Sequence, residues 1–124
     1  MKRITQFAFS LVLLLALTGC YVEAEPVRSA TVTFWQGGRP IKSWQLNGKQ
    51  VQGLSVWLQQ HRWGWHPVAA TYAPSTMIAI QHTNGAATGV NVMSKVIVLG
   101  QHQRSLSEEE STSLRALLQE ANGG

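Results

Sequence analysis

Aspartate is absent from this sequence of 124 residues, and glutamate occurs only six times. Glycosidases hold two carboxylates about 5 to 9.5 Å apart across one cleft, and calcium or magnesium sites need several carboxylate oxygens. Three of the glutamates follow one another at 108–110, where they suit the start of a helix. The composition therefore gives little support to catalysis by paired carboxylates or to a Ca²⁺ or Mg²⁺ site.

The sequence also has few residues arranged to bind metals or to act as nucleophiles. Its four histidines, His61, His66, His82 and His102, show no His-x-x-x-His spacing and no neighbouring cysteine, so a zinc signature is absent. The serines form no Gly-x-Ser-x-Gly turn, and a catalytic triad would lack its aspartate. We expect a noncatalytic protein without metal or cofactor, although separated histidines could converge in the fold.

The first residues have the pattern of an export signal. Lys2 and Arg3 give a positive start, and residues 7–17 form an apolar core of signal-peptide length. At about 1.5 Å per residue, the apolar segment up to Gly19 would reach only about 20 Å, less than the roughly 30 Å of the hydrocarbon layer. The pattern therefore favours a cleaved signal over a membrane-spanning helix.

The only cysteine closes the motif Leu17-Thr18-Gly19-Cys20. This motif resembles the lipobox of bacterial lipoprotein precursors. In that family the signal is cut before the cysteine, which carries a diacylglycerol on its sulfur and usually an acyl chain on its amino group. The resemblance implies a signal peptide at 1–19, cleavage between Gly19 and Cys20, and lipidation of Cys20. The alternatives are an ordinary secretory signal with an incidental cysteine, or a cysteine buried in the core.

The same resemblance implies a place in the cell. Three acyl chains exceed the two membrane signals that stable anchoring needs, so the mature protein would stay on the membrane. In this family, aspartate directly after the cysteine tends to retain the protein in the inner membrane, whereas this sequence has Tyr21. We therefore expect the periplasmic face of the outer membrane. With Cys20 lipidated, no thiol would remain for a disulfide, and the fold would depend on its hydrophobic core.

The mature chain would be one small domain with little net charge. Cleavage leaves 124 − 19 = 105 residues, enough for one domain. The signal carries two of the ten basic residues, so the mature charge is 8 − 6 = +2. Dispersed basic residues in an envelope compartment give little support to a nucleic-acid partner. The polar stretch at 20–29 predicts a lipidated tether, and 30–122 a single α+β domain.

Extended runs predict two β-hairpins. Their strands are expected at 30–35 with 41–46, and at 76–82 with 90–93. In the first hairpin, a loop with an odd number of residues would place Val32 and Trp44 on one apolar face. In the second, an odd loop with Gly85 at positive φ would align Ile78 with Val90.

Two helices complete the predicted fold. Asn47 is expected to cap a helix that ends near Arg62, and Ser107 with Glu110 has the spacing of a capping box for the last helix. Further strands are expected at 68–72 and 96–99. The latter is apolar on both faces, which favours a central strand or one covered on both sides. The order ββαβββα predicts an antiparallel α+β sandwich with its helices mainly on one face.

Five tryptophans, all in the first half of the domain expected at 30–122, are the unusual feature of the composition. We expect Trp44 and Trp57 in the core, because a small domain without disulfides needs large buried side chains. Aromatic residues in loops are enriched at interaction sites. We predict partner-binding surfaces at Trp63, Trp65 and His66, and at Trp35 and Arg39. Packing of Trp63 and Trp65 against the helix end is the alternative.

These observations lead to three hypotheses on function. The first is a lipid-anchored, noncatalytic envelope lipoprotein that binds another envelope protein, as an assembly partner, inhibitor or immunity factor. The second is a module that binds peptidoglycan or another glycan, since sugars stack on exposed indoles as protein partners do. The third, a small hydrolase, would need a histidine or carboxylate pair brought together by the fold.

Overall fold

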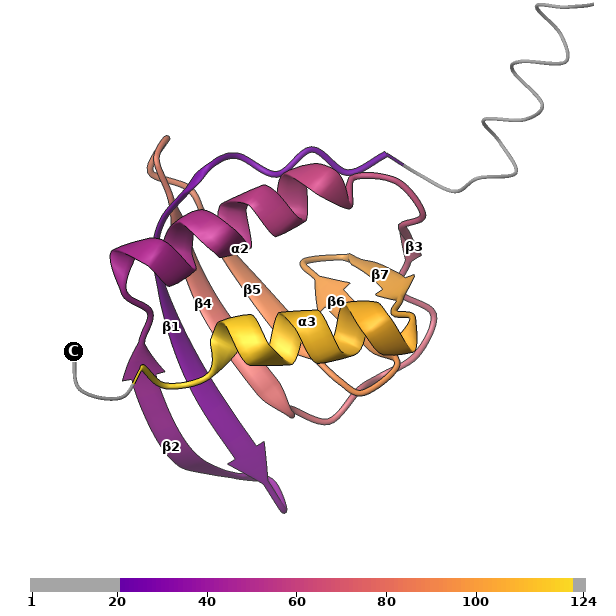
Figure 1. The fold of residues 1–124 in the computed structure, drawn as a ribbon. Helices are drawn as coiled ribbons and strands as arrows, with labels where there is room; N and C mark the ends of the chain where they lie inside the picture. The colour runs from indigo at the N-terminus through magenta and orange to yellow at the C-terminus, as the bar shows by residue number, and fades with distance from the viewer. Residues whose placement is uncertain (1–20, 122–124) are drawn as a thin grey trace, which may run out of the picture.

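The computed structural model describes residues 21–121. The predicted signal peptide at 1–19, and the cleavage and lipidation site at Gly19 and Cys20, lie outside this range. Figure 1 shows a sheet with two helices lying across it. The elements are β1 Val27–Gln36, β2 Arg39–Gln45, α2 Gly48–Gln60, β3 His66–Pro67, β4 Thr76–His82, β5 Ala87–Val92, β6 Val96–Leu99, β7 His102–Ser105 and α3 Glu108–Leu118.

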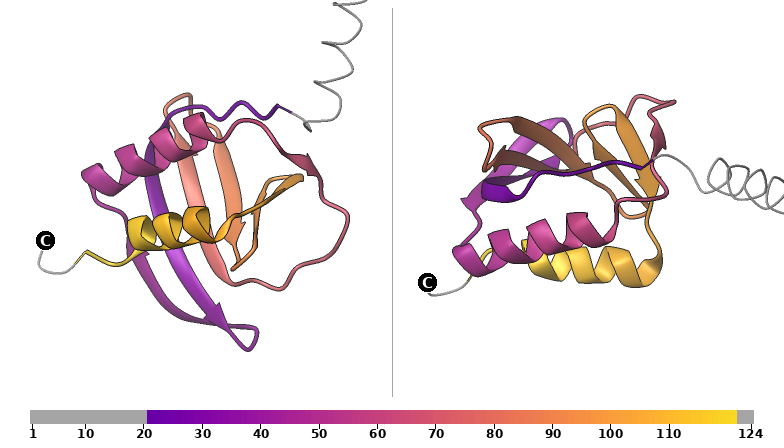
Figure 2. Two further views of the ribbon diagram at one scale, coloured as in Figure 1. Left: turned by 45° about the vertical axis from the view of Figure 1, so that its right-hand side comes forward. Right: turned by 90° about the horizontal axis from the view of Figure 1, so that it is seen from above.

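The sheet is antiparallel throughout, with the strand order β2-β1-β4-β5-β6-β7-β3. Both helices lie on the same face of it, as the right-hand view of Figure 2 shows. The predicted α+β class with helices on one face is confirmed. The predicted order ββαβββα is wrong in detail, because it has three strands between the helices, whereas the structure has five, β3 to β7.

The expected strand at 68–72 is irregular instead. Only the two residues of β3, just before it, pair with β7. From there to β4 the backbone bonds largely to side-chain amides: Ser75 N–H donates to Oδ1 of Asn91, and Nδ2 of Asn91 donates to the Ala73 carbonyl. A segment whose backbone groups bond to side-chain amides, and not to the backbone of a neighbouring strand, cannot form the regular hydrogen bonds of a sheet.

In the first hairpin Val32 and Trp44 share one face, as predicted, but the loop has an even number of residues where an odd number was predicted. Val32 lies opposite Trp44, so both point toward the helices. The turn itself has two residues, Gly37 and Gly38, both at positive φ (61° and 77°), as a tight hairpin turn requires. A bulge after Phe34 supplies the extra residue on β2 that restores the register.

The second hairpin is as predicted. Ile78 lies opposite Val90, and His82 N–H donates to the Ala86 carbonyl across a three-residue loop, 83–85. Gly85 has φ 89°. Strand β6 lies between β5 and β7, which confirms the predicted central position of 96–99. β7 itself was not predicted, because its His-Gln-Arg-Ser sequence is polar and lacks the alternation of a half-buried strand.

The core fills the space between the sheet and the two helices. Both predicted caps are confirmed: Asn47 and Ser107 each form a complete capping box. The half-buried Trp44 ties β2 to the end of α3 through a 2.9 Å hydrogen bond from its Nε1 to the Leu118 carbonyl. The largest side chains that are fully buried are Trp65, Leu54, Ile78, Ile80, Ile97, Leu114, Val32 and Val90.

The segment expected to be a tether is part of the domain. Val22 N–H donates to the Arg62 carbonyl at 2.7 Å, and Nε2 of Gln59 donates to the Ala24 carbonyl at 2.6 Å. Ala24 is 7% exposed and belongs to the core. Residues 22–24 are therefore part of the packed domain, which the sequence predicted to start at residue 30. Sequence composition did not indicate this docking, because it depends on partners about 35 residues away.

The close approach of the two helices explains the glycine inside α2. A Cβ added at Gly53 would lie 2.6 Å from Cδ1 of Leu117 in α3. We expect Gly53→Ala alone to change the free energy of unfolding by less than about 0.5 kcal/mol, because the clash offsets the gain in helix propensity. In a Leu117→Ala background the clash is gone, and the same change should stabilise by up to about 1 kcal/mol. Urea unfolding of the four proteins measures this, and an equal effect in both backgrounds would contradict it.

Candidate functional site

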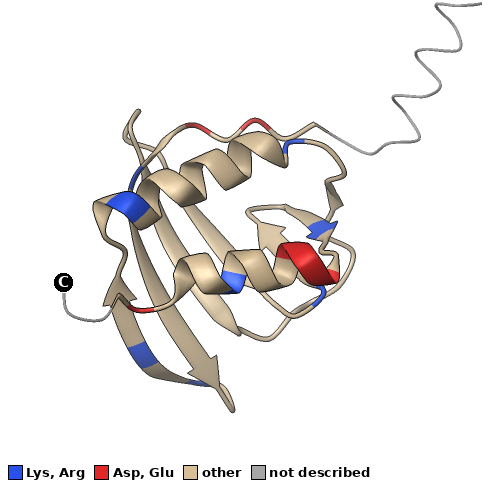
Figure 3. Ribbon diagram, in the orientation of Figure 1, with Lys and Arg blue, Asp and Glu red and all other residues tan. Residues whose placement is uncertain are grey.

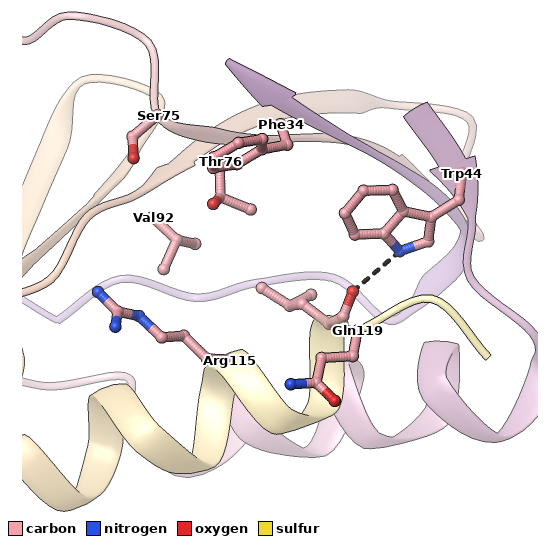
Figure 4. Close-up of a pocket in the computed structure, with 8 residues that line it drawn as sticks. Phe34, Trp44, Ser75, Thr76, Val92, Arg115 and Gln119 are labelled. Carbon is pink, nitrogen blue, oxygen red and sulfur yellow. Dashed lines mark hydrogen bonds between the residues drawn. The ribbon is translucent and has the colours of Figure 1, made fainter. Parts of the chain in front are cut away.

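A groove opens between the sheet and the C-terminal half of α3. Figure 4 shows Phe34, Thr76 and Trp44 on the sheet side of it, with Arg115 and Gln119 on the helix side. The groove has a volume of about 400 Å³. Its lining is Phe34, Trp44, Ser75, Thr76, Val92, Arg115, Leu118 and Gln119.

The groove forms because the sheet extends beyond the helices. Phe34 lies on the helix-facing side of β1 near the hairpin turn, and Figure 1 shows that this end of β1 and β2 extends beyond the part of the sheet that α3 crosses. Its side chain is 39% exposed, whereas Val32, two residues earlier on the same face, is fully buried. The hydrogen bond from Trp44 to the end of α3 closes one end of the groove. The result is a partly apolar surface, in which Phe34, Trp44, Val92 and Leu118 lie among four polar or charged residues.

One cation lies at the mouth of the groove. Arg115 is exposed in α3, and none of the ion pairs formed within residues 21–121 includes it. Lys42 on the neighbouring edge strand is paired with Glu120. Of the strands beside the groove, β4 and β5 contain no Lys, Arg, Asp or Glu, whereas β2 carries Arg39 and Lys42, the blue segments on that strand in Figure 3. The groove therefore combines apolar walls with a single available guanidinium group.

A more polar hollow lies further along α3, toward its N-terminus, with a volume of about 710 Å³. It shares Arg115 with the groove and adds Lys95 as a second cation. Hydroxyl groups provide much of its surface. The remaining lining residues are Ser94, Ser105, Leu106, Glu108, Ser111 and Thr112. Hydroxyl and cationic groups suit a polar ligand better than an apolar side chain.

Trp63 and Trp65 do not share a face. Trp63 is 49% exposed, whereas Trp65 is 1% exposed and donates its Nε1 hydrogen to the His61 carbonyl at 2.6 Å. In an extended segment these two residues would point the same way, because alternate residues lie on one side, and a single binding surface at Trp63 and Trp65 requires this. Gly64 instead has φ 89°, which turns the chain between them. Trp65 is therefore a core residue, and only Trp63 is available to a partner.

The other predicted binding residues lie at two separate places. His66 is exposed in β3, next to the loop that holds Trp63. Trp35 and Arg39 lie at the β1–β2 turn, where Trp35 is half-buried and Arg39 exposed. Trp35 follows Phe34 along β1 and does not line the groove. The structure thus brings neither set to the groove, although the second lies beside its rim.

A cluster of charged side chains joins the end of α2 to the start of α3. Nε2 of His61 lies 3.1 Å from Oε2 of Glu110, and Nη1 of Arg104 donates to the same oxygen at 3.0 Å. Nδ1 of His61 lies 2.6 Å from the Trp57 carbonyl oxygen, and the two rings stack at 3.9 Å. Oε1 of Glu110 accepts the Ser107 N–H in the capping box. Each polar atom of His61 and Glu110 therefore has a partner within the fold.

Burial and neighbours act on Glu110 in opposite directions. Partial burial raises the pKa of its carboxyl group, but the Ser107 N–H and the charge and hydrogen bond of Arg104 outweigh that effect. The pKa of Glu110 lies below its ordinary value of 4.5. A carboxylate held in its ionised form by fixed donors is suited to linking helices, and poorly suited to accepting a proton from a substrate.

The remaining histidines are dispersed. His82 is 5% exposed, with Nδ1 2.8 Å from the Glu25 carbonyl oxygen and Nε2 2.7 Å from the Thr88 hydroxyl, so it holds the N-terminal segment to β4 and β5. His66 and His102 lie in β3 and β7. Within residues 21–121, no three His, Cys, Asp or Glu side chains converge in a way that could hold a metal ion.

Comparisons with protein families, with curated proteins and with solved structures found no match to this chain. Neither helix in the part of the chain that the structure describes has the length and hydropathy needed to cross a membrane.

The sequence did not predict the groove. Trp44 was predicted to share an apolar face with Val32, but the exposure of Phe34 depends on where α3 crosses the sheet. Arg115 gave no signal in the sequence, because a single arginine on a helix is ordinary. The alternation along β1, together with the length of the last helix, was the only information available that bears on the site.

The Glu110 cluster predicts a pH-dependent contribution to stability. Glu110→Gln keeps the capping acceptor and loses the charge, so it should lower the free energy of unfolding by about 1 kcal/mol at pH 7. Because the folded-state pKa lies below 4.5, this contribution is complete above that pH and is lost as the pH falls through the folded-state value. Urea unfolding between pH 7 and pH 3 should show the two proteins converging in acid.

Glu109→Gln is the matched control, since it removes the same charge from the same helical turn at an exposed position. Glu109→Gln should lower the free energy of unfolding at pH 7 distinctly less than Glu110→Gln does. A Glu110→Gln effect that stays constant down to pH 3 would show that the ion pairs do not stabilise the fold.

Proposed function

We propose that this chain is a lipid-anchored, noncatalytic lipoprotein of the bacterial envelope that binds another envelope protein through the groove beside α3. The supporting observation is the groove itself, which has apolar walls formed by Phe34, Trp44, Val92 and Leu118 and Arg115 at its mouth. The motif at Leu17–Cys20 supports the anchor, and Tyr21 supports an outer-membrane location.

The occupant that fits is a protein segment with an apolar side chain next to an acidic one. An aliphatic or aromatic side chain would be buried between Phe34 and Leu118, where the surface is apolar. A neighbouring carboxylate would pair with the guanidinium group of Arg115, for which no acidic partner exists within residues 21–121. Buried aromatic contacts surrounded by a few polar groups are typical of protein interfaces. Roles in assembly, inhibition or immunity are all compatible with such a surface.

Glycan binding remains a second candidate, and the polar hollow supports it. Hydroxyl groups, Lys95 and Arg115 could hydrogen-bond to an acidic sugar polymer such as peptidoglycan. This hollow contains no tryptophan or tyrosine in its lining, and therefore lacks the stacking surface that the glycan hypothesis assumed. The groove has aromatic residues together with the aliphatic side chains of Val92 and Leu118, a combination that suits an apolar protein side chain better than a sugar. The hydrolase hypothesis has only the His61–Glu110 pair, whose polar atoms are already bonded within the fold.

The groove can be tested by substitutions that leave the core intact. In-cell crosslinking of the anchored protein, followed by identification of the attached chain, first defines the partner. With that partner purified, Phe34→Ala and Arg115→Glu should each weaken binding about tenfold, because each removes one of the two matched interactions. Calorimetry or fluorescence titration measures the loss.

Arg28→Glu is the matched control for Arg115→Glu, as it reverses one exposed charge far along β1 from the groove. It should bind as the wild type does. Equal weakening by both reversals would indicate a general charge effect and contradict a site at the groove. Cosedimentation of the domain with purified sacculi, unaffected by Phe34→Ala, would favour the glycan hypothesis instead.

The anchor predicts a specific mass change. Whole-protein mass spectrometry of the membrane-extracted protein should find a chain that starts at Cys20 and carries acyl groups. Cys20→Ser should remain as the precursor, because the modified sulfur is missing. Thr18→Ala, which keeps a small residue in the motif, should be processed normally. An unmodified Cys20 in the wild-type protein would contradict the lipoprotein assignment.

A further inference from the structure

An exposed aromatic cluster lies where the described chain begins. The rings of Tyr21 and Trp63 are 4.8 Å apart between centroids, and the two side chains are 42% and 49% exposed. Nη1 of Arg62 donates to the Tyr21 hydroxyl at 2.9 Å, with its guanidinium carbon 5.7 Å from the centre of the Tyr21 ring. We call Tyr21, Arg62 and Trp63 the aromatic pole.

The backbone around this cluster is held in place. Gly64 at φ 89° sends Trp65 into the core and leaves Trp63 outside. The Trp63 carbonyl accepts a 3.0 Å hydrogen bond from Nε of Arg104, which is itself paired with Glu110. On the other side, Nε of Arg62 donates to the Gln59 carbonyl at 2.8 Å. The two rings are thus presented to the outside by a loop that is bonded to both helices and to β7.

We propose that the aromatic pole lies in the headgroup layer of the membrane that anchors the protein. The inference rests on the proposed lipidation of Cys20. Cys20 precedes Tyr21 directly, so their Cα atoms are about 3.8 Å apart. Because Val22 is bonded to the end of α2, no free linker separates the anchored residue from the domain. The pole must then lie within a few ångströms of the acylated residue, at the level of the headgroups.

The chemistry of the pole fits that position. Tryptophan and tyrosine rings are enriched at membrane interfaces, because they combine an apolar body with a polar tip. No ion pair within residues 21–121 includes Arg62, so its guanidinium group can bind a lipid phosphate. Glu23 is exposed two residues beyond Tyr21 and limits the electrostatic attraction. Burial of the rings therefore supplies most of the affinity, and high salt should leave the contact in place.

This contact would set the orientation of the whole domain. In Figure 1 the described chain starts near the C-terminal end of α2, while the β1–β2 turn lies at the opposite end of the molecule. Phe34 of the groove is close to that turn in β1. With the aromatic pole on the bilayer, the groove would be directed into the periplasm. The alternative is that Trp63 contacts a protein and not the lipid surface. An experiment can distinguish these two possibilities.

The test uses the full lipidated protein, extracted from membranes and reconstituted into vesicles of phosphatidylethanolamine and phosphatidylglycerol. A phospholipid brominated near the start of its acyl chain quenches only indoles at the interface. We expect bromolipid to quench part of the wild-type tryptophan emission, and Trp63→Phe to lose most of that quenching. Trp35→Phe, a substitution at the other end of the molecule, should keep it. Unchanged urea midpoints would establish that both variants are folded.

The possible failures can be told apart. If mass spectrometry finds acyl groups on Cys20 but the wild type and Trp63→Phe are quenched alike, the aromatic pole is not at the membrane, and the proposed anchor and groove are unaffected. If no acyl groups are found, both the proposed lipidation of Cys20 and the proposed membrane contact of the aromatic pole are wrong. If Trp63 is insensitive to bromolipid and is shielded only when the purified envelope partner is added, the pole binds protein instead.

Discussion

Burial of one sheet face under two helices is the constraint on which the rest of this structure depends. Within residues 21–121 the sheet has seven strands and the two helices have 13 and 11 residues, so the cover is incomplete. The helices lie side by side with Gly53 at their closest approach, which brings α3 over the middle of the sheet. The far end of β1 and β2 is therefore left uncovered, and Phe34 is exposed there.

The same arrangement brings the end of α2 and the start of α3 together, where polar side chains link the two helices. The end of α2 meets the start of α3, where the stacked His61 and Trp57 rings adjoin the Glu110 carboxylate and Arg104. At the other end, Trp44 and Gln50 donate to carbonyl groups in the last turn of α3. Both ends of α3 are thus fixed by hydrogen bonds from other elements. A groove bordered by a helix held at both ends is pre-formed, which lowers the entropic cost of binding a partner.

The proposed function and the proposed membrane contact use opposite ends of the domain. The N-terminal segment runs along α2 and is bonded to Arg62, Gln59 and His82, so the anchored end has a defined place on the fold. A flexible tether would let the domain rotate freely above the bilayer. A docked segment instead couples the position of the lipid to the direction in which the groove faces.

Local chemistry by itself determined much of the secondary structure. The caps at Asn47 and Ser107, the turn at Gly85, the central strand at 96–99 and the facing of Val32 and Trp44 all follow from interactions between residues near in sequence. They were predictable because capping, turn geometry and alternation act over a few residues. The motif at Cys20 is likewise local, and its consequences for anchoring and location remain predictions.

Tertiary contacts decided the features that bear on binding. Trp65 entered the core and Trp63 stayed outside because Gly64 adopts a left-handed conformation that the contacts of Arg104 and the core select. Residues 21–26 became part of the domain through partners in α2, just after α2 and in β4. Arg115 became the cation of a groove only where α3 crosses the sheet. Each outcome depends on distant pairs whose meeting is set by packing of the whole chain, and no short stretch of sequence contains that information.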